Sequence, residues 1–265
     1  MEIIEKARRG MPFEDILIID CHCHMGYWRN FNLPCGSAEG MLASMDTLGI
    51  DIACAAANSS ICADYRYGNN MVIEAVTKYP GRFAGYATIN PNYPDDMQDE
   101  LDRCFANPGI KGIKVHPSSH GCPIDYKNYR IVYETADRKQ CPVLIHVWGS
   151  AAVAAVDRIA RQYPGARFIM GHAGADIRAM EEAIDVVNRH GNVYADLAIS
   201  LVREGNVEWF VKEMGSKKVL YGTDMPFFDP RSAFGRVAFA DISDEQKKDV
   251  FGRNMERLLN IRKDT

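Results

Sequence analysis

The chain alternates eight times between short apolar segments and longer amphipathic segments. The apolar segments are rich in β-branched residues, which is typical of strands buried on both faces. Strands of this kind that alternate with helices predict a parallel sheet covered by helices. The predicted strands span residues 16–22, 52–57, 83–89, 112–116, 143–147, 167–172, 193–197 and 219–222. The predicted helices span residues 38–48, 70–79, 95–106, 129–139, 152–163, 177–190, 207–214 and 244–259.

Eight such units favour a sheet that closes on itself. A (β/α)8 TIM barrel commonly occupies roughly 250 residues as one domain, and this chain has 265. We therefore expect an α/β fold with one barrel domain over residues 1–265, in which residues 1–15 form a short extension that packs as an extra helix. A doubly wound open sheet is the alternative, because alternation alone does not exclude it.

Four connections that follow predicted strands are long. In a barrel they lie at the ends of the strands where substrates bind, so the functional site is expected on that face. These connections span residues 25–36, 58–68, 117–128 and 225–241.

The composition is that of an ordinary folded domain with a small acidic excess. Hydrophobic residues make up 47% of the chain, charged residues 25%, and the formal net charge is −4. Nucleic acids and anionic membranes bind concentrated basic faces, so neither is an expected partner. No apolar run approaches the roughly 18 residues of a membrane span. The first residues, MEIIEKARRG, lack the apolar core of a signal peptide, so a cytoplasmic location is expected.

The eight cysteines are expected to be reduced thiols. Disulfide frameworks belong mainly to small secreted chains. Within predicted strands and helices a thiol behaves as a small buried hydrophobe. The cysteines in such segments are Cys21, Cys23, Cys54, Cys104 and Cys141.

The densest cluster of metal-binding residue types is Asp20-Cys21-His22-Cys23-His24, at the end of the first predicted strand. Side chains alternate along a strand, so the aspartate and both histidines are expected on one face and both cysteines on the other, toward the helices. Two imidazoles in this arrangement form a pair of nitrogen ligands for Zn²⁺. The same alternation argues against a mixed cysteine–histidine zinc site. Asp20 is a candidate for supporting the ligands from behind.

Polar residues recur at the ends of later predicted strands. His146 ends the fifth strand, His172 ends the sixth, and Asp224 follows the eighth. A single histidine or aspartate at such a place is more often structural. The ends of all strands meet on one face of a barrel, however, so these three side chains are expected to join His22 and His24 there.

Together these motifs resemble the amidohydrolase superfamily. The resemblance rests on the HxH pair of His22 and His24, on the single histidines His146 and His172, and on the GTDMP motif that contains Asp224. The segments IIDCHCHMG, GIKVHP, FIMGHAG and YGTDMPF are similar to the amidohydrolase 2 branch, which is named for aminocarboxymuconate-semialdehyde decarboxylase. That branch contains metal-dependent hydrolases and non-oxidative decarboxylases. The resemblance extends over nearly the whole chain.

The resemblance implies one divalent metal, usually Zn²⁺, with Mn²⁺, Fe²⁺ or Co²⁺ as alternatives. Its implied ligands are His22, His24, His146 and Asp224, and His172 becomes a catalytic or substrate-polarising histidine. Such a set leaves an open position for water, whose pKa the ion lowers. Asp224 would then take the proton of that water, and His172 would hydrogen-bond the hydroxide or the oxyanion it forms.

Lys114 and His116 lie in the predicted strand 112–116 and are expected to face the barrel axis. A buried lysine needs a partner. In binuclear members of the superfamily a carboxylated lysine on this strand bridges two metals, whereas the branch resembled here usually binds one. The other interpretations are contact of Lys114 or His116 with the substrate, and a buried salt bridge of Lys114.

Two further residues are candidates for substrate binding. Trp148 follows His146, and Arg29 lies in the connection after the HxH pair, where a guanidinium can form two hydrogen bonds to a substrate carboxylate. His120 and His190 are expected to be unrelated to catalysis. Weaker candidates near the same face are Tyr27, Trp28, Arg66, Arg231 and Arg236.

These features predict an enzyme that acts on a small molecule. We expect a hydrolase of a small carboxylate-bearing lactone, ester or amide. Decarboxylases of the resembled branch tend to have a larger loop after the HxH pair than residues 25–36, so this chain is expected to have a more open mouth that admits water. The alternative is a metal-dependent non-oxidative decarboxylase of an aromatic or enoic acid, which Tyr27, Trp28 and Trp148 would suit. A non-catalytic metal-binding barrel is less expected, because the ligand set is complete. The oligomeric state is left open, with a homodimer as one candidate.

Overall fold

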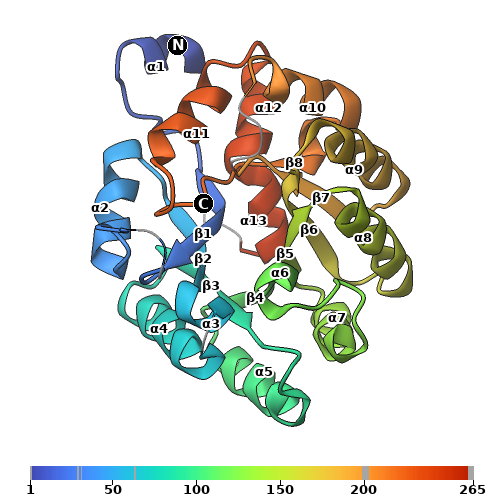
Figure 1. The fold of residues 1–265 in the computed structure, drawn as a ribbon. Helices are drawn as coiled ribbons and strands as arrows, with labels where there is room; N and C mark the ends of the chain where they lie inside the picture. Colours follow the sequence, from blue (N-terminus) through green and yellow to red (C-terminus); the bar gives the residue numbers. More distant parts are fainter. Residues whose placement is uncertain (1, 29, 31, 63, 199–202, 262–265) are drawn as a thin grey trace.

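A computed structural model of the protein describes residues 2–28, 30, 32–62, 64–198 and 203–261. Within these residues, eight parallel strands pair with one another in chain order. Figure 1 shows the strands at the centre of the molecule with the helices around them. The strands are β1 (Ile19–Met25), β2 (Ile52–Ala57), β3 (Phe83–Thr88), β4 (Ile110–Val115), β5 (Pro142–Trp148), β6 (Arg167–Gly174), β7 (Val193–Asp196) and β8 (Val219–Leu220).

The segment around β8 returns to β1, so the sheet forms a nearly closed barrel. The backbone N–H of Cys21 donates to the carbonyl of Tyr221, and the N–H of Asp224 donates to the carbonyl of His22. These bonds continue past the short regular part of β8. The predicted (β/α)8 barrel is therefore confirmed, and the sheet is not an open doubly wound one.

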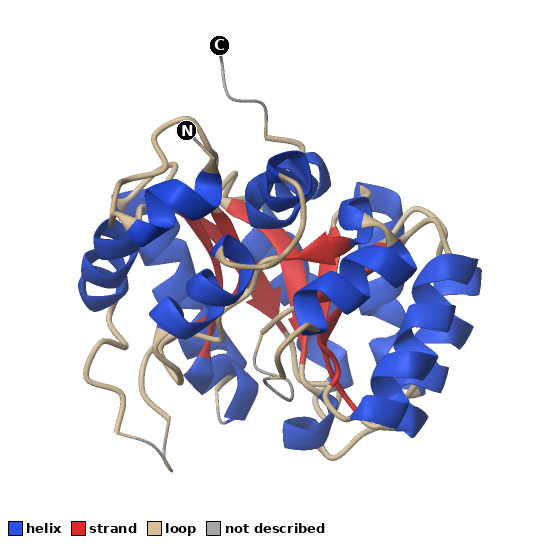
Figure 2. Ribbon diagram, turned by 90° about the horizontal axis from the view of Figure 1, so that it is seen from above, coloured by secondary structure: helices blue, strands red, loops and turns tan. Residues whose placement is uncertain are grey.

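Helices cover the outside of the barrel, as Figure 2 shows in blue around the red strands. α1 is the short helix expected before the first strand, and α2 has the predicted limits: Ser37 accepts from the N–H of Gly40, and Gly49 ends the helix at a φ of 69°. The helices are α1 (Ile3–Arg8), α2 (Ala38–Leu48), α3 (Asn58–Cys62), α4 (Tyr65–Lys78), α5 (Met97–Phe105), α6 (Pro117–His120), α7 (Arg130–Lys139), α8 (Ser150–Gln162), α9 (Ile177–Arg189), α10 (Asn206–Met214), α11 (Pro230–Ala238), α12 (Asp244–Lys248) and α13 (Asn254–Leu259).

Three of the long connections contain helices that the alternation did not predict, namely α3, α6 and α11. The start of α11 carries a recognisable signal, because the side chain of Asp229 accepts from the N–H of Arg231 and Pro230 occupies the first turn. The face above the strand ends is thus more ordered than a set of loops. Among the described residues, none of the helices combines the length and apolar character needed to cross a bilayer.

The first strand begins three residues later than predicted, and its alternation is interrupted. Its register with β2 shifts between Asp20 and Cys23. As a result Cys21 packs in the cluster inside the barrel, whereas Cys23 packs between the barrel and the helices. The prediction that both thiols face the helices is wrong for Cys21, because a bulge adds a residue to the alternation. All five cysteines that were expected to be buried are buried, namely Cys21, Cys23, Cys54, Cys104 and Cys141.

Alternate side chains of the strands fill the barrel interior, so the barrel is a packed core below the site. Tyr86 lies in this interior cluster and donates its hydroxyl to the carbonyl of Cys21. Met255, Leu258 and Leu259 of α13 belong to the same cluster and close the end at which the strands begin. The polar side chains described below therefore gather at the opposite end.

The predicted helix 244–259 is broken by a π-helical turn over Asp249–Arg253. Gly252 lies in this turn against the backbone of Leu17: a Cβ built on Gly252 would stand 2.0 Å from the carbonyl oxygen of that residue. A side chain at this position therefore has no space.

Gly252→Ala is expected to destabilise the protein by about 1–3 kcal/mol, the usual cost of forcing an added methyl into a packed core. In most helical positions the same change stabilises. Thermal unfolding should show a lower Tm for Gly252→Ala and a nearly unchanged Tm for Gly191→Ala, because a Cβ on Gly191 meets open space. An unchanged Tm in Gly252→Ala would contradict this packing.

Candidate metal centre

Three metal-binding side chains converge at the end of the barrel where the strands finish. His22 and His24 come from β1, and Asp224 follows β8. Oδ1 of Asp224 lies 3.2 Å from Nε2 of His24 and 3.7 Å from Nε2 of His22. All three residues are buried, and one ligand atom of each lies within 4.8 Å of those of the other two. One ion can contact all three at this spacing.

The backbone around Asp224 brings its carboxylate to this place. Its φ is 60°, a left-handed conformation that aspartate tolerates better than most residues. Behind it, the carboxylate of Asp20 accepts from the N–H and the hydroxyl of Thr223 and from the N–H of His22. Asp20 thus links β1, which carries His22 and His24, to the segment after β8, which carries Asp224.

The surroundings hold these groups in the protonation states that bind a metal. Burial, followed by the charge of Lys114, lowers the pKa of His22 well below its ordinary value, and burial lowers the pKa of His24. Burial acts to raise the pKa of Asp224, but its hydrogen bond with His24 and the nearby positive charges outweigh this, so that pKa is lowered. Two neutral imidazoles and an ionised carboxylate fit a divalent cation.

Asp196, at the end of β7, orients two histidines of the site and was not predicted. Its Oδ2 lies 2.9 Å from Nδ1 of His22, and its Oδ1 accepts the backbone N–H of His172. Because Nδ1 of His22 donates to this carboxylate, Nε2 of the same ring is left with a lone pair, which is how metal-binding histidines are usually held. Alternation in the strand 193–197 would have placed Asp196 inside the barrel, so the sequence did contain a signal.

Asp196→Asn is expected to weaken metal binding by about 10–100-fold, the usual cost of losing a carboxylate behind a metal-bound histidine. Competition with a chelator measures this affinity on purified protein. Asp157→Asn is the matched control, because Asp157 forms a similar carboxylate–histidine pair with His190 away from the site. Equal affinities for the two variants would contradict the role of Asp196.

His146 and His172 form a second pair beside the three donors. Nδ1 of His172 lies 3.0 Å from the carbonyl oxygen of Ala198 and donates to it, so Nε2 accepts from Nδ1 of His146 at 3.1 Å. Burial lowers the pKa of His146 to about 2 and that of His172 to about 4. The structure thus brings three of the four predicted ligands together and places His146 next to His172, outside the compact group.

Lys114 faces the barrel interior, as predicted, and is fully buried beneath the site. Its Nζ lies 2.9 Å from Nε2 of His22. Burial lowers its pKa to about 8, against the opposing charges of Asp224 and Asp196. Lys114 thus contacts His22 and lies within electrostatic range of both carboxylates.

A cavity of about 200 Å³ opens above the site. His116 and Trp148, two of the predicted substrate-binding residues, line it. The His116 ring stacks on that of His146 at a centroid distance of 4.1 Å, and the Trp148 ring stacks on His146 at 5.8 Å. The remaining described residues of the wall are His24, Trp28, His146, His172, Asp224, Phe227 and Phe228.

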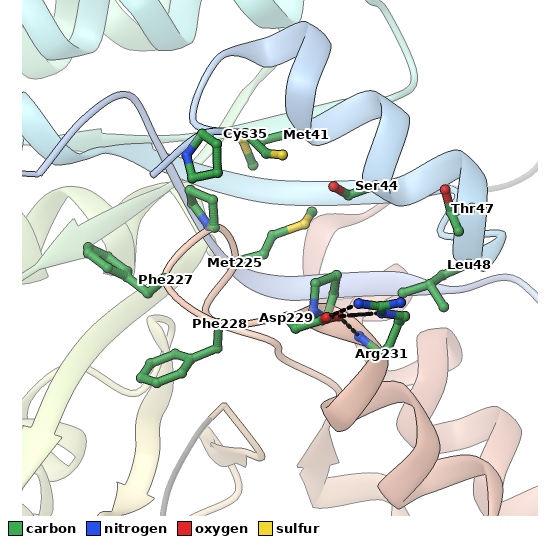
Figure 3. Close-up of a pocket in the computed structure, with 13 residues that line it drawn as sticks. Cys35, Met41, Ser44, Thr47, Leu48, Met225, Phe227, Phe228, Asp229 and Arg231 are labelled. Atoms are coloured by element: carbon green, nitrogen blue, oxygen red, sulfur yellow. Dashed lines mark hydrogen bonds and ion pairs between the residues drawn. The ribbon is translucent and has the colours of Figure 1, made fainter. Parts of the chain in front are cut away.

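Figure 3 shows the neighbouring pocket between α2 and the segment after β8, where Phe227 and Phe228 project away from α2. The charged residues that line this pocket, Asp229 and Arg231, bind each other.

The described residues among the other arginine and histidine candidates contact groups outside the cavity. Arg29 lies outside the described residues. Arg66 pairs with Glu100, and Arg236 donates to the carbonyl of Leu197. His120 contacts Tyr129 and His190 contacts Asp157, and neither histidine lines the cavity.

Comparison with known proteins shows which family the chain matches. A family model described as amidohydrolase matches residues 19–261. Gamma-resorcylate decarboxylase of Rhodococcus jostii (strain RHA1) is 23% identical, with 74% of this chain and 76% of the relative covered. 2-Amino-3-carboxymuconate-6-semialdehyde decarboxylase of Dictyostelium discoideum is 21% identical, with 74% and 66% covered. One similar solved structure is a dihydroxybenzoic acid decarboxylase of Polaromonas sp. JS666 with bound manganese and the inhibitor 2-nitroresorcinol. Its TM-score is 0.76 and its identity 19%, and the match covers 92% of this chain and 97% of that one.

These comparisons contradict the prediction of hydrolysis. The named relatives are decarboxylases, which supports the alternative given with that prediction. The prediction rested on an open mouth beside the connection of residues 25–36. Instead, Trp28 of that connection lines the cavity above the donors together with other aromatic residues.

Proposed function

The chain belongs to the amidohydrolase family, and we propose that it is a metal-dependent decarboxylase of a small aromatic acid. One observation carries this proposal: two of the three metal-binding side chains, His24 and Asp224, line a cavity of about 200 Å³ whose outer wall is made of aromatic rings. Pockets for drug-sized ligands measure roughly 300–1,000 Å³, so this one suits a single substituted ring. Flat rings on its wall favour a planar ligand.

His22, His24 and Asp224 would hold one divalent ion, with His146 as the fourth ligand. Zn²⁺ is bound more tightly than Mn²⁺ by such nitrogen and oxygen donors, whereas the solved relative contains manganese. Each ion should therefore be loaded separately into metal-free protein when activity is tested. When bound, the ion supplies a positive charge that fixes the carboxylate or a neighbouring oxygen of the acid.

The protein residues perform the remaining steps. Aromatic side chains orient the ring and exclude water, and an apolar wall favours loss of neutral CO₂ from an anionic carboxylate. The bond between the ring carbon and the carboxylate breaks, and that carbon needs a proton. We assign this transfer to Asp224, which borders the cavity. Ionised at rest, it would take up a proton from solvent and pass it to that carbon, which returns it to the ionised form. His172 is a neutral imidazole whose N–H donates to the carbonyl of Ala198, so it would polarise the substrate as an acceptor at Nε2, where a ring hydroxyl would replace Nδ1 of His146.

Four further residues complete the proposal. His116 and Trp148 contact the substrate, because both line the cavity. Lys114, whose Nζ contacts Nε2 of His22, would give up that contact to the ion and keep its charge near Asp224 and Asp196. The assignment of Arg29 to the substrate carboxylate remains a prediction.

The proposal is tested with metal-free protein reloaded with Mn²⁺ or Zn²⁺ and supplied with hydroxybenzoates, 5-carboxyvanillate, lactones and esters. Release of CO₂ and formation of acid are followed separately. The proposal expects metal-dependent CO₂ release from at least one aromatic acid. Acid formation from a lactone or ester without any CO₂ release would refute it.

A further inference from the structure

We propose that His116 selects substrates by an oxygen substituent on the ring, to which it donates a hydrogen bond from Nε2. The inference rests on the proposed function and names the part of the site that recognises a hydroxylated aromatic acid. Because the inference concerns the affinity for a ligand, it can be tested without measuring decarboxylation.

The local backbone fixes the tautomer of His116. This residue precedes α6, and its Nδ1 accepts the backbone N–H of Ser119 at 3.4 Å and lies 3.3 Å from the hydroxyl of Ser118. A neutral imidazole that accepts at Nδ1 carries its proton at Nε2. The helix cap therefore makes the other nitrogen of the ring a hydrogen-bond donor.

Packing fixes the direction of that donor. The ring lies nearly parallel to the ring of His146, with an interplanar angle of 17°, and its centroid is 6.5 Å from that of Trp28. A ring held by a cap on one edge and by a stacked partner on one face has little freedom to turn. Because His116 lines the cavity, Nε2 is the polar atom it offers to a ligand there.

The rest of the outer wall makes this donor selective. Phe227 and Phe228 provide no polar atom, and Trp148 is 60% exposed, so its N–H competes with water. A donor beside these rings discriminates between ligands, since a bound ligand without an acceptor covers the N–H and leaves it unpaired. The site should therefore prefer an aromatic ligand with one more ring oxygen to an otherwise identical ligand without it.

Two substitutions separate the donor from the helix cap. In His116→Asn the amide oxygen replaces Nδ1 and keeps the cap, but no donor remains at the place of Nε2. In His116→Gln the amide nitrogen replaces Nε2 and keeps the donor, but the cap is lost. Trp28→Phe keeps an aromatic ring beside His116 and removes the indole N–H, which tests whether the indole provides the selectivity.

The test measures the dissociation constants of 2-nitroresorcinol and 2-nitrophenol by calorimetry on Mn²⁺-loaded protein. The wild type should prefer 2-nitroresorcinol by about tenfold, the effect of one hydrogen bond and of the penalty for leaving it unmade. His116→Gln and Trp28→Phe should keep this ratio, and His116→Asn should reduce it to about one.

A ratio that survives in His116→Asn, or one that disappears in His116→Gln, would overturn the assignment to Nε2. Loss of the ratio in Trp28→Phe would assign selectivity to the indole and would also overturn it. Equal binding of both ligands by the wild type would refute the inference but leave the decarboxylase proposal intact. Binding of neither ligand would count against the proposed function itself.

Discussion

His24→Ala is expected to lower metal affinity by more than a hundredfold and to abolish turnover. Residues that only support a ligand cost about 10–100-fold when replaced, so a ligand should cost more. His24 is a better position for this test than His22, because replacing His22 would also remove the contacts that it makes with Asp196 and Lys114. Metal analysis after dialysis and chelator competition measure the effect.

His190→Ala is the control, because this histidine pairs with Asp157 far from the site. It should bind metal and turn over substrate like the wild type. Circular dichroism confirms that both variants are folded. A folded His24→Ala protein with a full equivalent of tightly bound metal would remove this residue from the ligand set.

His172→Asn is expected to keep its metal and to lose turnover by about a hundredfold or more, the scale of one group that moves or polarises a proton. Asparagine suits the position, because His172 has a φ of 65° and asparagine tolerates this left-handed conformation. Its amide can also donate to the carbonyl of Ala198 in place of Nδ1. Metal content and kcat are measured on the same preparation.

His146→Asn provides the comparison that assigns roles within the pair. The proposal places His146 on the metal and His172 on the substrate, so only His146→Asn should lose metal affinity. The opposite result, with metal lost from His172→Asn and retained in His146→Asn, would exchange the two roles.

The barrel and most of its site follow from local patterns. Eight strand–helix units predicted a parallel sheet covered by helices and favoured its closure, because strands buried on both faces need helices on the outside. His22, His24 and Asp224 lie at the ends of strands that are neighbours only in a closed barrel. Oδ1 of Asp224 lies 3.2 Å from Nε2 of His24 and 3.7 Å from Nε2 of His22. This proximity depends on closure of the barrel, which the eight units favoured.

Other features depend on geometry that the patterns do not specify. The shift of register in β1 turned Cys21 inward, and no sequence signal locates such a bulge. Asp196 carried a signal, since alternation places it inside the barrel, but a lone aspartate at the end of a strand is more often structural. The reaction was predicted incorrectly because the length of a connection does not reveal that aromatic rings line the cavity beside it.

The most direct measurement of the central claim follows carboxyl-¹³C 2,6-dihydroxybenzoate in D₂O with Mn²⁺-loaded protein. A decarboxylase of the proposed kind releases ¹³CO₂ and places one deuterium on the ring carbon that carried the carboxylate. Mass spectrometry detects both products, and chelator-treated protein should yield neither. An absence of ¹³CO₂ from this acid and from every other aromatic acid tested, with an ester or lactone hydrolysed by the same preparation, would contradict the account.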